Sequence, residues 1–593
     1  MNLLKNNKQL FILLLLVLGL NANTLWNQYA VDDEIVMLGN TYVQKGILGI
    51  PDILSHDFFS GVKGIDQIGL SGGRYRPFAL VVFAFEYQLF GANPFVSHLI
   101  NILLFALLIT LLFHVLKNYI FKEQHYLFAF ITCLLFVVHP IHTEVVANVK
   151  SRDELLSFIL ILVSLLAVIR NIEKRSIAFL ISGLVCFFLA LLTRETAVTF
   201  IVILPMLLFY FLKQNIKKSI LYTLPLVAVF IVYLFIRFSV IGFKTYSIET
   251  DVLNDPYLFA TASQAFATKI FVLLKYLILL FIPHPLSSDY SFNQIPYVNV
   301  SSIQFMLSVI VLTALLIIAA IQFKKKTILS FSVFYFLITI FLVANFVVNI
   351  GAPLAERLLF QPSLAFCLVM ASGYILLQFR LRWLANSLLV TLLILFSVKT
   401  IVRNSEWKNN ETLYLADVIS APNSVRTNLY AGKQYINKAQ HENDIQLKNQ
   451  YLDNAIQCDK KLLEIYPHYQ DVDVYEDLGL AYYCKLDYFT AGDYWAQAFR
   501  TDPNMQGSIE TVSNLLFDEG NKQYNAGNIN EAIRQYKKAA EVNMNNAEAW
   551  YRLGGNYFLV NDTKNAFEAW QMVARINPQH PFNKDEFKKI TTP

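Results

Sequence analysis

Long apolar runs fill most of the first 402 residues and restrict the fold that this chain can adopt. A helix needs about 20 apolar residues to cross the hydrocarbon core of a bilayer. Several of eleven runs reach that length, and the shorter ones are expected to be sheltered by neighbouring helices. Only 15% of the residues are charged, as in an integral membrane protein. The predicted fold class is all-α, a polytopic bundle of about eleven spans at residues 9–25, 95–116, 126–138, 155–169, 177–192, 197–212, 220–240, 303–323, 328–348, 360–379 and 384–402.

Basic residues gather in alternate loops, which predicts the orientation of the bundle. Lys and Arg are in excess in cytoplasmic loops, so these loops and the N-terminus are predicted to be cytoplasmic. The first run is expected to remain as a helix, because no small-residue cleavage site follows it. The run at 264–281 would break the alternation if it crossed, so we expect it to lie along the outer interface or to re-enter. The stretch at 78–90 predicts a second interfacial helix, ending at Gly91.

The chain becomes polar after residue 403, which predicts two domains. The transmembrane domain would cover 1–403, with a first outer loop at 26–94, and an extracytoplasmic domain would cover 404–593. In the second domain Gly520 and Gly554 open the same local pattern 34 residues apart, which is the period of tetratricopeptide repeats. We expect an α-solenoid that binds extended peptide on its concave surface, with a structural cap as the alternative.

Charge and cysteine content exclude some other classes of protein. The net charge of +5 is explained by basic loops on one side of the membrane, so no nucleic-acid partner is expected. The five cysteines lack metal-type or CxxC spacing. Cys458 and Cys484 are interpreted as ordinary helix cysteines, with a disulfide in an oxidising compartment as the alternative.

Three consecutive carboxylates, Asp32, Asp33 and Glu34, follow the first apolar run. An Asp in the hydrocarbon core costs roughly 3 kcal/mol on the insertion scale, so these residues should lie outside it. The predicted topology places the other conspicuous polar clusters at the same outer face. We therefore expect Asp32 and Asp33 to form the floor of a polar site that later loops complete.

The later outer loops supply the candidate substrate-binding residues. Histidines and carboxylates suit a sugar or acid–base work, and arginines suit a phosphate because the guanidinium donates two parallel hydrogen bonds. These candidates are Arg76, His139, His142, Glu144, Arg194, Glu195, Arg237, Asp289, Glu356 and Arg357.

Each candidate also has a plainer interpretation. The two histidines with Glu144 could ligate a metal, although no further His or Cys has suitable spacing and no metal site is expected. Arg194 and Glu195 could be solvated helix ends, Arg237 could snorkel, and Arg357 could pair with Glu356. Ser151 and Glu154 match a capping box that would open the next helix.

Six motifs together resemble the transmembrane and tetratricopeptide-repeat protein O-mannosyltransferases, which belong to the C-type-fold glycosyltransferases that use polyprenyl-phosphate sugars. The motifs are Asp32-Asp33, Arg76-Pro77-Phe78, Leu89-Phe90-Gly91, His98-Leu99-Ile100-Asn101, His139-Pro140-Ile141-His142-Thr143-Glu144 and Ala355-Glu356-Arg357. The resemblance covers nearly the whole chain. It implies that the Asp pair is the catalytic motif and that the donor sugar is used at the outer or lumenal face. Family members often have Lys-Glu in place of Arg194-Glu195 and a longer repeat array, and these departures concern the donor sugar and the acceptor.

The residues and the resemblance together predict an inverting glycosyltransferase. It would move a hexose, mannose in first place, from a polyprenyl- or dolichyl-phosphate to a Ser or Thr hydroxyl of a protein bound through the repeats. Asp32 is the preferred base and Arg357 the preferred phosphate ligand, with Arg237 or Arg194 assisting. No cofactor is certain, and a divalent cation is not favoured.

Two other functions and two locations stay open at this point. The acceptor could be a lipid or a glycan, or the chain could be a non-catalytic, membrane-anchored repeat scaffold. A bacterial inner membrane with periplasmic repeats is preferred to an endoplasmic reticulum membrane with lumenal repeats.

Overall fold

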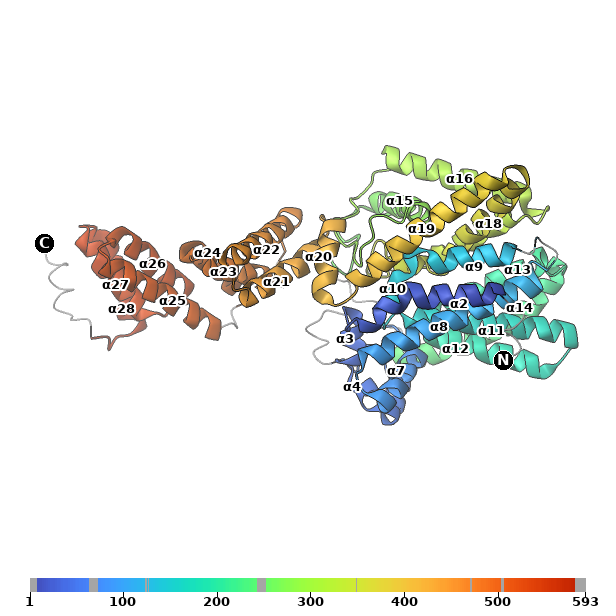
Figure 1. The fold of residues 1–593 in the computed structure, drawn as a ribbon. Coiled ribbons are helices and arrows are strands. Elements are labelled where there is room, and N and C mark those ends of the chain that lie inside the picture. Colours follow the sequence, from blue (N-terminus) through green and yellow to red (C-terminus); the bar gives the residue numbers. More distant parts are fainter. Residues whose placement is uncertain are drawn as a thin grey trace. The chain divides into compact units, whose positions relative to one another are not determined.

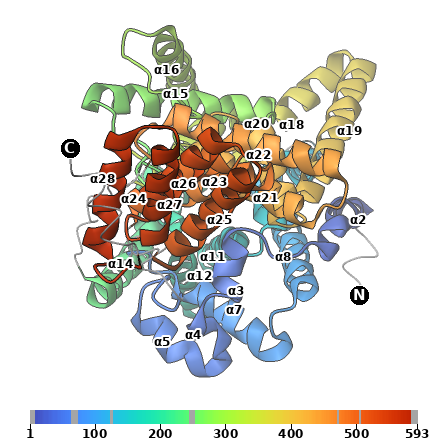
Figure 2. The same cartoon turned by 90° about the vertical axis from the view of Figure 1, so that its left-hand side faces the viewer.

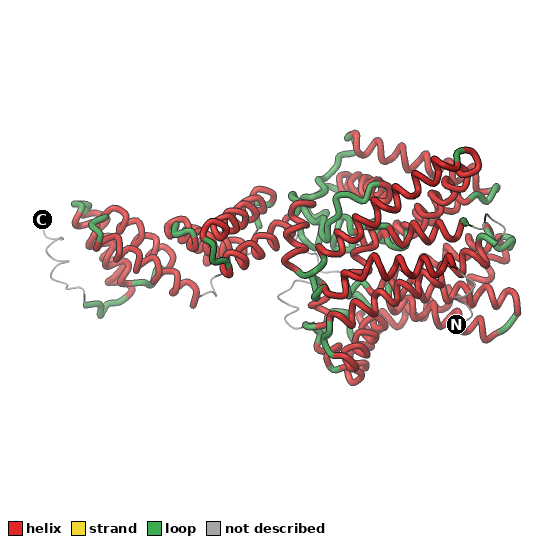
Figure 3. The backbone as a smooth tube through the Cα atoms, viewed as in Figure 1, coloured by secondary structure: helices red, strands yellow, loops and turns green. Residues whose placement is uncertain are grey.

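The computed structural model describes residues 8–62, 73–122, 125, 127–242, 252–347, 349–469, 472–502 and 506–581. These residues form helices and loops without a β-strand, so the described part of the chain is all-α (Figure 3). The chain divides into two compact units, Met1–Pro422 and Asn423–Pro593. The boundary predicted after residue 403 falls instead inside helix α19 (Arg382–Glu406), and α20 (Asn410–Ser420) belongs to the first unit.

The first unit is a bundle of long helices with short helices at one end (Figure 1). Its remaining α-helices are α2 (Lys8–Asn21), α3 (Asp32–Met37), α4 (Thr41–Gln44), α5 (Ile50–Ser55), α7 (Pro77–Phe90), α8 (Pro94–Val115), α9 (Phe128–Val138), α10 (Thr143–Ala147), α11 (Arg152–Lys174), α12 (Ile177–Thr193), α13 (Phe200–Tyr210), α14 (Ile216–Ile241), α15 (Ala262–Phe281), α16 (Ile303–Phe323), α17 (Ile328–Phe341) and α18 (Ser363–Arg380). Short 3-10 helices include η1 (Ala22–Trp26), η2 (Gly46–Gly49), η4 (Pro140–His142), η5 (Glu195–Thr199) and η6 (Glu356–Leu359).

Most, but not all, of the eleven predicted runs form helices long and apolar enough to cross a membrane. Among the described residues, eight helices are long and apolar enough to cross a membrane, or nine if the bent pair α9–α10 counts as one span. Three of the predicted spans correspond to α12, α13 and α17, which are apolar but only 17, 11 and 14 residues long. They are shorter than the roughly 20 residues that a straight span requires. The chain is therefore a multi-pass integral membrane protein with eight or nine candidate spans.

Helix α15 contains the run whose topology was difficult to predict. By length and composition it could cross a membrane. In the structure α15 runs across the direction of α2, α8 and α19. It is seen end-on in Figure 1, where those helices lie lengthwise, and lengthwise in Figure 2. This direction is the one expected of a helix that lies along a membrane surface rather than through it.

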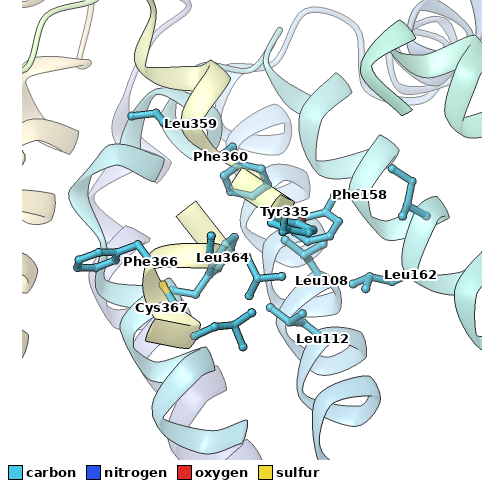
Figure 4. Close-up of a cluster of buried hydrophobic side chains, with 14 of the residues drawn as sticks. Leu108, Leu112, Phe158, Leu162, Tyr335, Leu359, Phe360, Leu364, Phe366 and Cys367 are labelled. Carbon is cyan, nitrogen blue, oxygen red and sulfur yellow. The ribbon is translucent and has the colours of Figure 1, made fainter. Parts of the chain in front are cut away.

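The core of the bundle is formed by Leu and Phe side chains from α8, α11, α17 and α18. Figure 4 shows Leu108, Phe158, Tyr335 and Leu364 packed together. Phe360, just before α18, is fully buried and its ring centroid lies 4.9 Å from that of His142. The apolar core therefore continues up to the turn that follows α9.

The first outer loop folds into a small layer of its own. Helices α3, α4, α5 and α7 enclose apolar side chains that include Met37, Phe58 and Phe83. The helix predicted at 78–90 is α7, and its end is confirmed at Gly91, which has a φ of 63°. Glycine adopts such a φ without steric cost.

The second unit consists of paired antiparallel helices. They are α21 (Val425–His441), α22 (Ile445–Ile465), α23 (Val472–Cys484), α24 (Tyr488–Thr501), α25 (Gln506–Asn525), α26 (Ile529–Val542), α27 (Ala547–Leu559) and α28 (Thr563–Ile576). A glycine in the first helix of three pairs lies against an aromatic ring of the second: Gly479 against Trp495, Gly520 against Tyr536, and Gly554 against Trp570. A larger side chain at these glycines would collide with the ring, which explains the recurring pattern. The five cysteines are all free thiols, including Cys458 and Cys484.

Candidate active site

The two adjacent carboxylates at the start of α3 point into different surroundings. Asp33 is buried, and its Oδ1 accepts a hydrogen bond of 2.7 Å from the backbone N–H of Lys150. Burial raises the pKa of Asp33 to about 7, even though backbone N–H groups at Lys150, Val149 and Ala30 favour its charged form. Asp32 keeps 36% of its side-chain surface exposed. Asp32 is therefore the carboxylate of this pair that a substrate can reach.

A strained turn sets the direction of these carboxylates. Val31 has φ 52° and ψ −118°, and the N–H of Asp33 donates to the carbonyl of Ala30 over 3.1 Å. This is the geometry of a type II′ turn, whose first central position normally takes glycine. The N–H of Val31 donates to Oδ1 of Asn410 in α20 at 2.7 Å. Strained residues of this kind are found where the surrounding structure holds them for function.

Asp32 lies among cations. Its Oδ2 is 3.1 Å from Nζ of Lys150, in the turn between α10 and α11. Burial alone would raise the pKa of Asp32, but the positive charges of Lys150, Arg357 and Arg74 outweigh it and lower the pKa to about 2. Burial lowers the pKa of Lys150 more than Asp32 raises it. Asp32 is consequently ionised at neutral pH.

The loop before α18 and the helix α10 meet beside Asp32. The backbone N–H of Arg357 donates to Oε2 of Glu144 at 2.8 Å, and its guanidinium donates to the other carboxylate oxygen. The charge of Arg357 also acts on Asp32, so the two groups lie at the same end of the bundle. Two segments more than 300 residues apart thus contribute to one site.

A second group of charges joins the first outer loop to α11 and η5. Arg76 donates to Asp153 at 2.9 Å and to Glu195 at 2.8 Å. Arg194 donates to the same Asp153 oxygen at 2.8 Å and contacts Glu154 at 2.9 Å. Burial would raise the pKa of Glu195, but the charges of Arg76, Arg237 and Arg194 together with a backbone hydrogen bond outweigh it and lower the pKa. Arg76, Arg194 and Glu195 therefore lie together, as three of the predicted site residues.

Arg237 reaches this group from α14. Its Nη2 donates to the carbonyl of Gly73 at 2.7 Å, next to Arg74 in the chain. Its charge also lowers the pKa of Glu195. The snorkelling interpretation is incomplete, because the head group is engaged by the outer loop.

His139 and His142, the two histidines of the His139–Glu144 motif, are bound by other groups than the Asp32 and Asp33 carboxylates. His142 is buried, with Nδ1 2.7 Å from the carbonyl of Phe136 and Nε2 2.8 Å from Oγ of Ser363. His139 is fully buried, with Nε2 3.0 Å from the carbonyl of Leu280. Both rings hold the break between α9 and η4, where proline interrupts the helix. Within the described ranges, no group of three or more His, Cys, Asp or Glu side chains is placed to hold a metal ion.

Glu356 and Asp289 belong to a separate polar group. Oε1 of Glu356 accepts from the N–H of Ser287 at 2.5 Å and from the hydroxyl of Tyr290 at 2.8 Å. Burial raises the pKa of Glu356 to about 8. Asp289 accepts from the N–H of Ser291 in its own loop. These contacts shape the 286–291 loop.

Three features of the site were not selected from the sequence. Lys150 and Arg74 both act on Asp32, yet neither was chosen, because their side chains come from loops whose path the sequence does not give. Glu86 in α7 forms a buried ion pair with Arg152; a lone carboxylate in an apolar helix was the available signal. The predicted capping box is wrong, since the Ser151 side chain makes no cap hydrogen bond, and the N–H of Ser151 donates instead to the side chain of Asn148.

Comparisons with known proteins agree with this architecture. A family model described as TPR repeat matches residues 520–561. The human protein named Protein O-mannosyl-transferase TMTC1 is 25% identical over 470 residues, covering 68% of this chain and 50% of that protein. A Caenorhabditis elegans Protein O-mannosyl-transferase, F38B6.6, is 26% identical, covering 72% and 60%. Human Protein O-mannosyl-transferase TMTC3 is 22% identical, covering 97% and 68%.

Solved structures add little to these relatives. The crystal structure of MamA covers 31% of this chain at 17% identity, with a TM-score of 0.18. A score this low supports no conclusion about the fold.

The fold and the site define a class: a multi-pass membrane protein with a charged site at one end of its bundle and a tetratricopeptide-repeat region after it. Within that class the chain is a distant homologue of the TMTC protein O-mannosyl-transferases, at 22–26% identity over most of its length. Its curated homologues are protein O-mannosyltransferases. The chain spans 50% and 60% of the length of the first two of these relatives.

Proposed function

We propose that this protein transfers a hexose, in first place mannose, from a polyprenyl-phosphate donor to a Ser or Thr hydroxyl of an acceptor protein. The observation that carries the proposal is one charged site built from α3, the α10–α11 turn, η5 and η6, in which a partly exposed, ionised Asp32 lies beside several cations. The phosphate of a lipid-linked sugar is an anion that a site with several cations can bind. The homology to protein O-mannosyltransferases supports the same reaction.

The proposed reaction inverts the anomeric centre in one displacement. The acceptor oxygen attacks the anomeric carbon while its proton passes to the Asp32 carboxylate, which is the general base. The bond from the anomeric carbon to the phosphate oxygen breaks, and its electron pair stays on the polyprenyl phosphate. The leaving phosphate gains a second negative charge, so it needs fixed cations rather than a proton donor.

The neighbours of Asp32 take supporting roles in this proposal. Asp33 accepts backbone N–H groups and holds the turn that presents Asp32, so it acts as a positioning residue. Glu144 and Arg357 form one wall, and the pair Arg76–Glu195 with Arg194 forms another. His142 positions the wall that contains Glu144, because it anchors the turn before α10.

The finer architecture is also part of the proposal. Counting the short apolar helices as sheltered spans and α15 as an interfacial helix gives eleven crossings of a C-type glycosyltransferase fold. The site and the repeats would then face the periplasm or the lumen, where the repeats bind the acceptor protein.

An Asp32→Asn variant tests the function. The amide cannot accept the proton, so we expect transfer from polyprenyl-phosphate mannose to a Ser/Thr peptide to fall by about 10²–10⁴-fold. The measurement is incorporation of radiolabelled mannose by the purified full chain in nanodiscs. Asp52→Asn is the matched control, because Asp52 is an exposed carboxylate of the same loop paired with Lys45. Full transfer by a folded Asp32→Asn variant would refute the role of Asp32.

A further inference from the structure

The cations around Asp32 fall into two groups. Arg76, Arg194, Arg357 and Lys150 each lie within 3.1 Å of a carboxylate oxygen. Their charges are balanced before any substrate arrives. Arg74 and Arg237 differ, since among the described residues neither has an ion-pair partner.

Arg74 lies between the two parts of the site. Its guanidinium carbon is 5.4 Å from the ring centroid of Phe59, which supports it from one side. Its charge interacts with Asp32 and with Glu195, and it is repelled by Arg76 and Arg357. An unbalanced cation in this position attracts an anion.

Two further donors converge from α14. Tyr233 and Arg237 are four residues apart and share one face of the helix, and Arg237 also binds the carbonyl of Gly73 beside Arg74. The Tyr233 hydroxyl and Nε of Arg237 are buried and have no hydrogen-bond partner among the described residues. Leaving a buried donor unpaired is unfavourable, so these donors indicate a ligand rich in acceptor oxygens.

The lipid-facing surface of the same helix suits a prenyl chain. Phe238, the residue after Arg237 in α14, is 36% exposed. A prenyl chain attached to a phosphate beside Arg237 would enter the bilayer past this side chain. Free inorganic phosphate would gain nothing from that surface.

We propose that Arg74 is the principal ligand of the donor phosphate, with Arg237 and Tyr233 as additional donors, and that Arg357 instead positions Glu144 and the base. This inference rests on the proposed function and changes the phosphate ligand preferred from the sequence. When the bond to the sugar breaks, the leaving phosphate gains charge, and an unpaired guanidinium can donate two parallel hydrogen bonds to it. Arg357 already donates from Nη1 and from its backbone N–H to Glu144.

Binding of polyprenyl monophosphate, the reaction product, tests the assignment without turnover. The full chain in nanodiscs is titrated with this lipid, with inorganic phosphate and phosphatidylglycerol as competitors. Arg74→Gln should weaken binding by about ten- to a hundredfold, the loss expected for hydrogen bonds to a charged group. Arg74→Lys should recover part of the affinity, because a lysine supplies the charge without the fork. Lys45→Gln, an exposed cation of the same loop, should bind like the wild type.

The outcomes separate this inference from the proposed function. If the wild type does not bind polyprenyl monophosphate, the proposed function and the inference both fail. If the wild type binds, and a folded Arg74→Gln binds equally well while Arg357→Gln does not, only the inference is overturned. Equal competition by phosphatidylglycerol or inorganic phosphate would also overturn it, because the site would then not select a prenyl phosphate. The melting temperature of each variant shows whether it is folded.

Discussion

At the scale of single residues, Asp32 and Asp33 show how one helix turn gives two carboxylates different properties. Asp33 is buried against backbone amides and its pKa is raised to about 7. Asp32 faces Lys150 and its pKa is lowered to about 2. A base with so low a pKa takes up a proton weakly, because general-base efficiency is best near the working pH. In the proposed reaction, the cations that keep Asp32 ionised would therefore also limit its strength as a base until a donor phosphate balances them.

This balance predicts a pH effect for Lys150→Gln. Removing the ammonium leaves burial less opposed, so the pKa of Asp32 rises from about 2 towards or above its usual value near 4. The wild type should show no acid limb in kcat/KM above pH 4, and the variant should gain one. The proposed reaction needs the ionised Asp32 carboxylate, so the variant should lose rate as the pH falls through the raised pKa.

Lys150→Gln should also change how the stability of the folded protein depends on pH, and the direction of this change can be predicted. A carboxylate with a lowered pKa stabilises the folded state above its unfolded pKa, and this contribution is lost as the pH falls from about 4 towards 2. Lys150→Gln should reduce that contribution and so flatten the acid dependence of the melting temperature. Identical pH profiles for the variant and the wild type would contradict the ion pair; Lys45→Gln is the control.

At the scale of elements, the placement of α7 depends on one buried ion pair. Arg152 opens α11 and is fully buried. It pairs with Glu86 of α7 and donates to the side chain of Asn101 at 2.7 Å and to the carbonyl of Ser97 at 3.0 Å. Breaking a buried pair by removing one partner leaves the other charge uncompensated. The pair therefore fixes α7 against α8 and α11, next to the turn that carries Lys150.

A double-mutant cycle tests this role. Glu86→Leu alone should destabilise the protein by about 3–5 kcal/mol, since it leaves Arg152 buried without its partner. Adding Arg152→Met should recover part of that loss, because two apolar side chains need no desolvated charge. Thermal unfolding of the three variants in nanodiscs measures the coupling. Additive effects of the two single changes would show that the pair does not hold α7.

At the scale of the whole molecule, the fold can be predicted from the sequence better than the arrangement of the site. The apolar runs predict the helices because a helix that is buried in lipid must consist mainly of apolar residues. The glycine pattern predicts the repeats because Gly520 and Gly554 must accept the rings of Tyr536 and Trp570. The orientation of side chains is harder to predict from the sequence. His142 turns into the core because its partners, the Phe136 carbonyl and Ser363, are set by helix packing. The difference between Asp32 and Asp33 likewise depends on Lys150, 117 residues away from Asp33.

The first compact unit extends past residue 403, where the composition changes, to Pro422, and α20 shows why. This helix is polar, yet Asn410 accepts from the strained turn before Asp32, and Asp417 lies 2.9 Å from Nη1 of the fully buried Arg403. Asp417 also accepts from the N–H of Ser288 at 2.9 Å. A polar helix after the last apolar run thus belongs to the membrane unit because of its contacts.

Two truncations follow from this difference. A chain ending at Pro422 keeps these contacts, so we expect it to insert, to melt near the full-length value and to transfer mannose to a short Ser/Thr peptide. A chain ending at Arg403 loses Asn410 and Asp417, leaves a buried guanidinium without its partner and should lose about 3–5 kcal/mol of stability together with its activity. Donor-dependent transfer and melting temperature, measured side by side, check both expectations. Equal behaviour of the two chains would show that α20 is dispensable. A chain ending at Pro422 could instead be stable and bind polyprenyl phosphate but transfer to no peptide. That result would show that the repeats take part in the reaction itself. Acceptor capture alone cannot explain a loss of transfer when the peptide is at saturating concentration.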